Sequence, residues 1–227
     1  MLKLHIANKN YSSWSLRPWL VMKVFNFQFE EIIHPFPENG VWDLYRLFSP
    51  SGKVPCLEDG ARIVWDSMAI IEYLAEEKPE IWPLDKITRT WARCAAAEMH
   101  SGFQTLRNIC GMSCGVRVEL HEISKALQKD INRIDELWNQ GLTEFGGPFL
   151  AGDKFSAVDA FYAPVVFRAQ TYQLPLSNTS KHYLQTLLKL PAMQEWYQSG
   201  IEERWREPAH EEEVLNAGKI IADYRKK

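Results

Sequence analysis

The sequence has few cysteines and no long apolar run. Its 227 residues include four cysteines, at positions 56, 94, 110 and 114. That number is too small for a disulfide scaffold and is typical of a reducing compartment, so we expect a cytoplasmic protein. Cys110 and Cys114 lack the further ligands of a structural zinc site, and we expect packed thiols and no metal. No stretch approaches the ~20 apolar residues of a membrane span, and residues 1–10 lack the apolar core of a secretory signal, so we expect no membrane partner.

The sequence also lacks an excess of positive charge. It has 26 Lys and Arg against 29 Asp and Glu, which gives a net charge of −3. No basic run is interleaved with aromatic residues, as a nucleic-acid surface would require, so we expect no nucleic-acid partner. Hydrophobic residues make up 46% and charged residues 24%, which is ordinary globular usage and argues against intrinsic disorder. A globular protein with a small-molecule ligand is the favoured class.

Residues 1–79 predict a compact α/β unit. Leu2 to Ala7 alternates apolar and polar side chains as a strand does, and apolar residues recur at helical spacing from Ser15 onward. Asp66 and Ser67 begin a later helix that ends before Pro79. The expected strands are residues 2–7, 29–33, 54–57 and 61–65, with a short helix at 42–48. This order predicts a sheet packed against helices.

Residues 80–86 predict a linker, and residues 87–227 predict an all-helical domain in which we expect no strand. Apolar residues keep helical spacing from Thr88 to Ile109 and again from Leu120 to Trp138. Further helices are expected from near residue 156 and over residues 184–190 and 192–197. The fold class is therefore α/β followed by all-α.

Four separated motifs carry a family resemblance. They are Ser12 to Arg17 at a strand-to-helix turn, Gly52-Lys53-Val54-Pro55 in a loop, Asp66-Ser67 at a helix start, and Phe149 to Asp159 before a later helix. Each motif alone is weak. In this order and at these separations they resemble the cytosolic glutathione transferases, also called glutathione S-transferases, over nearly the whole chain. The serine-containing turn is similar to that of the zeta and tau classes.

The resemblance implies a thioredoxin-like N-terminal domain, here residues 1–79, followed by a C-terminal helical bundle, here residues 87–227. It implies glutathione as the cosubstrate, a two-fold homodimer, and conjugation of glutathione to a small electrophile, which is the chemistry of detoxification. Ser156 to Asp159 has the spacing of a capping box, and we assign it to folding rather than to chemistry.

The serine-containing turn predicts how such an enzyme would hold a thiolate. A free thiol titrates near ~8.5, and the N–H groups at a helix N-terminus favour its anion. A serine hydroxyl can donate one more hydrogen bond to the sulfur. In the zeta and tau patterns the active serine lies five positions before an arginine, which selects Ser12, five before Arg17. Ser13 is the runner-up and Tyr11 the third candidate, and the alternative for a serine here is that it only caps the helix.

The resemblance also assigns a glutathione-binding set. The Val54–Pro55 bond would be cis, and the backbone of Val54 would pair with the peptide as an added strand does. Lys53 would approach a glutathione carboxylate, although a solvated loop charge explains it equally well. Asp66 would pair with the γ-glutamyl ammonium and Ser67 with its carboxylate, and ordinary helix capping is the alternative.

A second-substrate pocket is expected between the two domains. Its candidate lining residues are Trp14, Met99, His100, Phe103 and Arg107, and the C-terminal tail is a candidate lid. Met99 and Phe103 are of types more often found in a core than in a pocket, and a lone helical histidine such as His100 is usually structural. The acidic run of residues 211–213 is most simply a solvated face.

Two other functions remain open. One is a zeta-like, glutathione-dependent cis–trans isomerase acting on a small diacid. It ranks second because Trp14 stands where the zeta pattern has cysteine, and an indole suits a small polar pocket poorly. The other is a non-catalytic glutathione-binding, ligand-binding or stress-regulatory protein of the same fold. Catalytic activity, rather than affinity for glutathione, separates the transferase from this last alternative.

Overall fold

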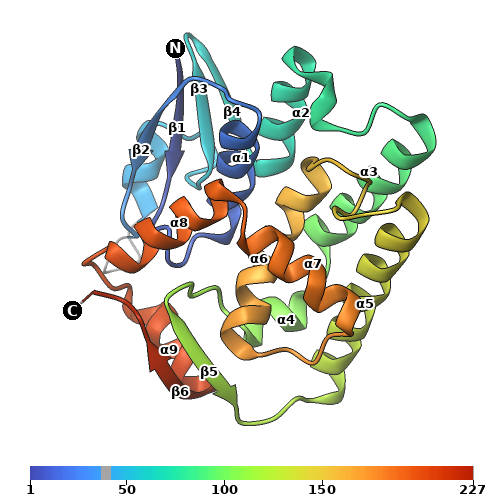
Figure 1. Ribbon diagram of the computed structural model, residues 1–227. Helices are drawn as coiled ribbons and strands as arrows, with labels where there is room; N and C mark the ends of the chain where they lie inside the picture. Colours follow the sequence, from blue (N-terminus) through green and yellow to red (C-terminus); the bar gives the residue numbers. More distant parts are fainter. Residues whose placement is uncertain (37–41, 227) are drawn as a thin grey trace.

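The computed structural model describes residues 1–36 and 42–226 (Figure 1). Its N-terminal part contains a sheet of four strands: β1 (Leu2–Ile6), β2 (Phe29–Ile33), β3 (Cys56–Asp59) and β4 (Arg62–Trp65). The strand order is β2-β1-β3-β4. β1 and β2 are parallel, whereas β3 is antiparallel to β1 and to β4.

Two helices, α1 (Ser13–Val24) and α2 (Ser67–Glu77), pack beside this sheet. The side chains of Leu4 in β1, Leu16 in α1 and Ile70 in α2 are fully buried in one core. α1 provides the crossover that the parallel strands β1 and β2 require. The predicted α/β order of this part is confirmed, and a 3-10 helix, η1 (Trp42–Leu47), lies where the short helix was expected.

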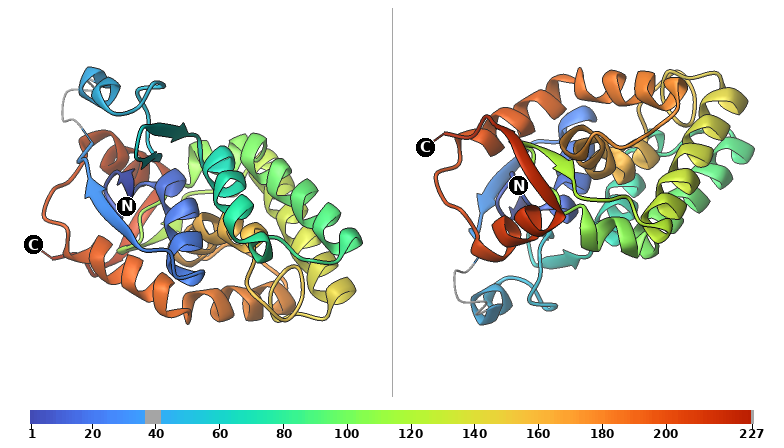
Figure 2. Two further views of the ribbon diagram at one scale, coloured as in Figure 1. Left: turned by 90° about the horizontal axis from the view of Figure 1, so that it is seen from above. Right: turned by 90° about the horizontal axis from the view of Figure 1, so that it is seen from below.

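The rest of the chain is mainly helical (Figures 1 and 2). Its helices are η2 (Pro79–Ile81), α3 (Lys86–Ser101), α4 (Gln104–Ile109), α5 (Lys125–Phe145), α6 (Ala157–Tyr172), α7 (Asn178–Leu188), α8 (Pro191–Glu202) and α9 (Pro208–Ala217). Every residue of α6 except Gln170 is buried, because α1, α3 and α7 pack around it. α6 is therefore the central helix of this part.

Two strands in the helical part contradict the prediction that none follows the linker. β5 (Val116–Leu120) and β6 (Gly218–Asp223) form an antiparallel pair, and Figure 1 shows it beside α9 at the bottom of the molecule. Val116 and Val118 are buried while Glu119 is exposed. This alternation is short, and its partner strand lies close to the far end of the chain, so a local pattern does not reveal the pairing.

Two predicted helix boundaries are wrong for local reasons. The helix expected over residues 88–109 ends at Ser101, because Phe103 takes a left-handed conformation with φ 58°, and α4 follows as a separate helix. The helix expected from Leu120 begins after that residue's strand has ended, where the side chain of Ser124 caps α5.

α8 passes beside α1 and joins the two parts of the structure (Figure 1). Trp19 of α1 and Trp196 of α8 meet edge to face, with ring centroids 5.0 Å apart. Trp196 Nε1 also donates to the carbonyl of Lys9 at 2.8 Å. A Cβ on Gly200 of α8 would lie only 3.1 Å from the backbone nitrogen of Asn10. Glycine therefore lets the turn before α1 lie directly against α8.

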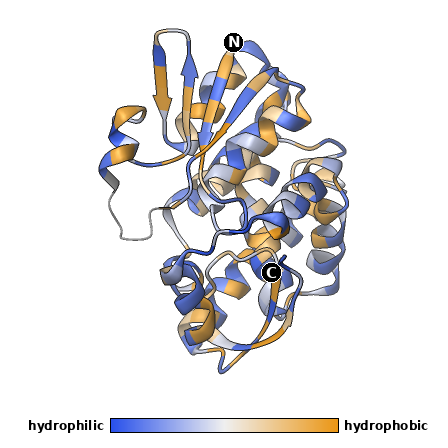
Figure 3. Cartoon of the chain, turned by 90° about the vertical axis from the view of Figure 1, so that its left-hand side faces the viewer, coloured by the Kyte–Doolittle hydropathy of each residue, from blue (hydrophilic) through white to orange (hydrophobic). Residues whose placement is uncertain are grey.

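Hydrophobic and hydrophilic residues alternate along most helices (Figure 3), as expected for helices with one face buried. Among the helices of residues 1–36 and 42–226, none combines the length and the apolar character that a bilayer crossing requires.

The predicted capping box at the start of α6 is a buried polar cluster centred on Asp159. One carboxylate oxygen accepts the backbone N–H of Ser156 at 2.9 Å. The other accepts the backbone N–H of Leu150 and the hydroxyl of Tyr183, each at 3.0 Å. Burial raises the pKa of Asp159 to about 6. Because the cluster joins the loop before α6 to α7, its role is structural, as predicted.

Asp159→Ala would leave these donors buried without an acceptor. We expect the free energy of unfolding to fall by about 2–5 kcal/mol, measured by urea denaturation followed by circular dichroism. Asp153→Ala, at an exposed position of the same loop, is the matched control and should change it by less than about 0.5 kcal/mol. Equal stability of the two variants would contradict the structural role.

Candidate functional site

A cavity of about 710 Å³ lies where the N-terminal part meets the helices. The turn before α1, the loop before β3, the junction of α3 and α4, and α9 all contribute to its wall. The lining residues with chemically useful side chains or backbone groups include Tyr11, Ser12, Ser13, Trp14, Lys53, Val54, His100, Arg107, Arg168 and His210. Most of the residues predicted for the site are thus brought together.

Ser12 and Ser13 stand at the N-terminus of α1 and line the cavity. Ser12 is the residue before the first helical turn, but its side chain does not cap the helix. Its hydroxyl donates to Ser15 Oγ at 2.7 Å. The hydroxyl of Ser13 has no hydrogen-bond partner among the described residues. Since no side chain caps the helix, its first N–H groups remain available to an anion.

Tyr11, the third candidate, is committed to another partner. Its hydroxyl donates to Glu211 of α9 at 2.6 Å, and its side chain is buried. Burial and this carboxylate raise the pKa of the Tyr11 phenol. The hydroxyl therefore joins α9 to the turn before α1, and a thiolate would have to displace Glu211 to reach it.

The loop before β3 contributes backbone groups. Val54 and Lys53 line the cavity, and the Val54–Pro55 bond is cis, as the resemblance implies. The Lys53 side chain is exposed, and only its backbone N–H is bonded locally, to Ser51 Oγ at 3.2 Å. This arrangement leaves the Lys53 ammonium able to meet a carboxylate.

Asp66 and Ser67 stand at the start of α2, as predicted, but neither lines the cavity itself. Asp66 has φ 74°, an uncommon conformation for a non-glycine residue, and accepts the backbone N–H of Met68 at 2.7 Å. Its second carboxylate oxygen lies 3.4 Å from Nε2 of His100, which does line the cavity. His100 therefore connects this pair to the cavity wall.

Arg17 is an important residue whose role the sequence pattern did not reveal. Its side chain is fully buried, and Nη1 lies 3.4 Å from the hydroxyl of Ser67. The guanidinium stacks on Trp14, 4.2 Å from the ring centroid, and packs against Phe161 at 5.1 Å. Within residues 1–36 and 42–226, Nε and Nη2 have no hydrogen-bond partner. Burial lowers its pKa well below the ordinary value, yet no carboxylate among the described residues pairs with it.

The predicted second-substrate pocket needs correction at two positions. Trp14, His100 and Arg107 line the cavity, but Met99 and Phe103 are buried in the core instead. Their side chains fill the space between helices because apolar groups are more stable there than beside a polar cavity.

Arg107 and Arg168 add positive charge to the cavity wall. Arg107 donates to the carbonyls of Gly102 and Met99 and lies 4.9 Å from the Trp14 ring. Burial lowers the pKa of Arg107 to about 10. Arg168, which the sequence analysis did not single out, reaches the cavity from α6 and donates to the carbonyl of Cys110. Neither arginine makes an ion pair with a described residue.

Cys110 and Cys114 are buried free thiols, as expected. Burial raises the pKa of the Cys110 thiol to about 12. Within the part of the chain that the structure describes, no three His, Cys, Asp or Glu residues are grouped as metal ligands.

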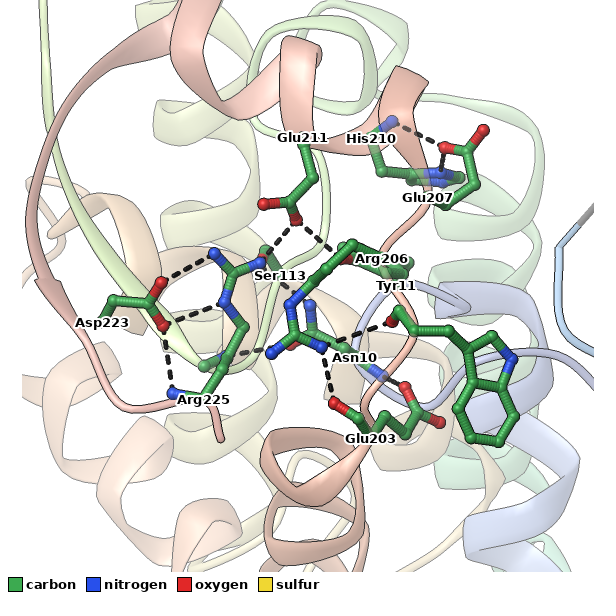
Figure 4. Close-up of polar contacts among 12 residues, drawn as sticks. Asn10, Tyr11, Ser113, Glu203, Arg206, Glu207, His210, Glu211, Asp223 and Arg225 are labelled. Carbon is green, nitrogen blue, oxygen red and sulfur yellow. Dashed lines mark hydrogen bonds and ion pairs between the residues drawn. The ribbon is translucent and has the colours of Figure 1, made fainter. Parts of the chain in front are cut away.

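The C-terminal segment, residues 203–226, holds the turn before α1 in place (Figure 4). The carboxylate of Glu203 accepts the backbone N–H of Lys9 at 2.6 Å and that of Asn10 at 3.1 Å. Arg225 donates to Glu211, which also accepts from Tyr11. The acidic run of residues 211–213 is therefore not simply a solvated face.

Family models identify both halves of the chain. The glutathione S-transferase N-terminal domain matches residues 11–77, and the glutathione S-transferase C-terminal domain matches residues 116–199. Together these ranges span more than half of the protein. The chain belongs to the glutathione S-transferase family. The expected fold, a thioredoxin-like domain followed by a helical domain, is confirmed.

The glutathione S-transferase matches include relatives of the zeta type. The chain is 27% identical to maleylacetoacetate isomerase of Rattus norvegicus over 189 residues, which are 80% of this chain and 85% of that protein. It is 28% identical to a zeta-class glutathione S-transferase of Euphorbia esula, over 75% of this chain and 76% of that protein.

Solved structures agree on the fold. A glutathione transferase homologue from Burkholderia GL BGR1, with bound glutathione, superimposes with a TM-score of 0.67 at 20% identity. The match covers 88% of this chain and 97% of that one. A diazinon-metabolizing glutathione S-transferase of Bombyx mori gives a TM-score of 0.69 at 16% identity, with the same coverage of both chains.

The buried Glu203 carboxylate, which binds the turn before α1, predicts a pH dependence of stability. Burial raises the pKa of Glu203 to about 7, from an ordinary 4.5. The folded state therefore binds more protons than the unfolded state between these values, and stability falls as the pH rises through the window. We expect the free energy of unfolding of the parent, relative to Glu203→Gln, to decrease from about pH 5 to about pH 8.

The measurement is urea denaturation at four pH values. Glu202→Gln is the matched control, since the neighbouring Glu202 is exposed and its pKa is lowered by a hydrogen bond from Gln198 and by Lys226. If the free energy of unfolding of the parent and that of Glu203→Gln differed by the same amount at every pH, the prediction would be contradicted.

Proposed function

We propose that this protein is a glutathione transferase that binds glutathione, stabilises its thiolate at the N-terminus of α1, and conjugates it to a small electrophile. The observation that carries the proposal is the uncapped start of α1, where Ser12 and Ser13 face a cavity. Helix N–H groups and a hydroxyl are the donors that stabilise a thiolate. Ser12 is the first candidate for the hydroxyl, although it must turn from Ser15, and Ser13 is the second.

The rest of glutathione would lie between the loop before β3 and the start of α2. The backbone of Val54 would pair with the cysteinyl part of the tripeptide, and Lys53 would meet a carboxylate. Asp66 would bind the γ-glutamyl ammonium, and Ser67 with the adjacent N–H groups of α2 would bind its carboxylate. Arg17 adds positive charge behind Ser67 and favours the same anion.

The electrophile would occupy the side of the cavity that Trp14, Arg107 and Arg168 line. The indole offers an apolar face, and the two guanidiniums favour an acceptor that carries an anionic group.

A second candidate function, glutathione-dependent cis–trans isomerisation of a small diacid, is supported by the same two arginines. Several relatives are named maleylacetoacetate isomerases. The bulky indole of Trp14, which contacts Arg17 and Arg107 and lines the cavity, suits a small polar diacid poorly, and this keeps the isomerase function second. The test is spectrophotometric measurement of the turnover of a cis-configured unsaturated diacid with catalytic glutathione. Turnover would make isomerisation the favoured function, and no turnover would exclude it.

We also propose that the protein acts as a homodimer in the cytoplasm. Ile63 and Trp65 on the edge strand β4 are apolar and partly exposed, which favours a second copy as their cover. The four free cysteines favour a reducing compartment. Sedimentation velocity tests the dimer, and a single species of 26.4 kDa would contradict it.

The thiolate role is tested by ultraviolet difference titration of bound glutathione against pH. In the parent we expect the thiol to titrate at least about one pH unit below its free value of about 8.5. Ser12→Ala should move it back toward that value and reduce kcat, while Ser13→Ala should have the smaller effect. A reversed order would assign the role to Ser13. An unshifted thiol in the parent, despite saturable binding, would support a non-catalytic binding protein instead.

The binding role of Asp66 is tested by measuring the affinity for glutathione of Asp66→Asn, with Ser12→Ala as the control variant. Asp66→Asn removes the charge that would pair with the γ-glutamyl ammonium but keeps an acceptor for the helix N–H. We expect its Kd for glutathione, measured by calorimetry, to rise about tenfold, as the loss of a charge-assisted hydrogen bond predicts. Ser12→Ala should leave Kd nearly unchanged. An unchanged Kd in Asp66→Asn would contradict this assignment.

A further inference from the structure

A histidine–carboxylate pair lies at the edge of the cavity, on a helix outside both family-matched ranges. His210 stands in the first turn of α9 and lines the cavity. Its Nδ1 lies 2.6 Å from the Glu207 carboxylate, which also accepts the His210 backbone N–H at 2.7 Å (Figure 4). One carboxylate therefore fixes both the helix start and the imidazole.

The ring itself is held from two sides. Phe36 stacks on it with centroids 5.0 Å apart and planes 21° apart, and Tyr11 packs against it at 5.0 Å. The Tyr11–Glu211 hydrogen bond and the Glu211–Arg225 ion pair anchor α9 beside the turn that carries the serines.

The hydrogen bond to Glu207 decides which ring nitrogen is available. Nδ1–H donates to the carboxylate, and Nε2 has no hydrogen-bond partner among the described residues. A carboxylate on Nδ1 with a free Nε2 is the arrangement in which histidine exchanges protons with a substrate. The other cavity histidine, His100, is arranged differently, since its Nε2 faces Asp66 and its Nδ1 is buried without a partner.

Two of the charged groups near His210 are poorly placed or poorly suited to donate a proton. Glu211 and Glu213 share its helix, and Glu211 is engaged by Tyr11 and Arg225. From α6, Arg168 also lines the cavity, but a guanidinium holds its proton throughout the ordinary pH range.

We infer that His210 is the proton donor to the second substrate, with Glu207 as its positioning residue, and that the substrates which need it are conjugated carbonyl compounds. This inference rests on the proposed transferase function. It adds a proton donor to that function. The donor is needed for addition and not for substitution, because only addition leaves a carbanion that must be protonated.

The reaction is an addition across the C=C bond of the acceptor. The thiolate sulfur forms a C–S bond to the β-carbon, and the C=C π pair becomes the electron pair of an enolate. The imidazolium N–H bond breaks as its proton passes to the α-carbon, giving the saturated thioether and neutral imidazole. The imidazole then takes a proton from solvent, into which the glutathione thiol had released its own.

The test compares two electrophiles on one variant. With ethacrynic acid, a conjugated ketone, His210→Gln should lower kcat by about 10- to 100-fold, the size of a general-acid contribution. With chlorodinitrobenzene, chloride leaves and no carbon is protonated, so the same variant should stay within about threefold of the parent. Circular dichroism and glutathione affinity confirm that the variant is folded. A loss of equal size with both electrophiles, or no loss with either, would overturn the inference.

Chemical rescue separates proton transfer from packing. In His210→Ala, added imidazole should restore ethacrynic acid turnover, whereas pyrazole, of the same size but far less basic, should not. Glu207→Gln, whose amide still accepts the backbone N–H, should lose activity with ethacrynic acid only. Rescue by both azoles would mean that His210 only fills space and would overturn the inference. If the parent turned over neither electrophile, the proposed transferase function would fail, and this inference with it.

Discussion

The site depends on one interaction between distant parts of the chain: the Glu203 carboxylate accepts hydrogen bonds from the backbone N–H groups of Lys9 and Asn10. These residues form the turn that aims the N-terminus of α1 at the cavity. The carboxylate is buried, and Gly200 lets α8 lie against the same turn. The position of a candidate thiolate site in the N-terminal domain is therefore fixed by residues at the end of the helical domain.

The second constraint is buried positive charge. Burial lowers the pKa values of Arg17, Arg107 and Arg168. Repulsion between guanidiniums lowers those of Arg17 and Arg107 further. None pairs with a carboxylate among the described residues; carbonyl oxygens and aromatic faces partly offset the loss of water instead. A cation held in this way gains more from an incoming anion than an exposed one does, because the anion is met at low dielectric. The cavity wall is thus suited to an anionic ligand, as the proposed binding of glutathione requires.

Much of this could be predicted from sequence where the determinants are local. The serine turn, the Val54–Pro55 loop and the start of α2 are each specified by adjacent residues, and all lie where expected. The β5–β6 pair was missed because its two strands come from distant segments, and strand alternation over five residues is easily hidden beside a long helical stripe. Met99 and Phe103 were misplaced for a related reason: helical periodicity tells which residues are buried, but not whether they face a core or a cavity.

His210 and Arg168 could not have been selected from the sequence at all. A single histidine or arginine on a helix carries no local signal, and its meaning comes from partners that the fold brings to it, here Glu207 and the cavity wall. The proposed site has two halves. Its proposed glutathione half comes from residues 11–77, which the family model describes. Part of the electrophile half is built from α9, which lies beyond residue 199, where the second family match ends. The proposed acceptor chemistry is therefore the property that family membership determines least, because it depends in part on the residues of α9.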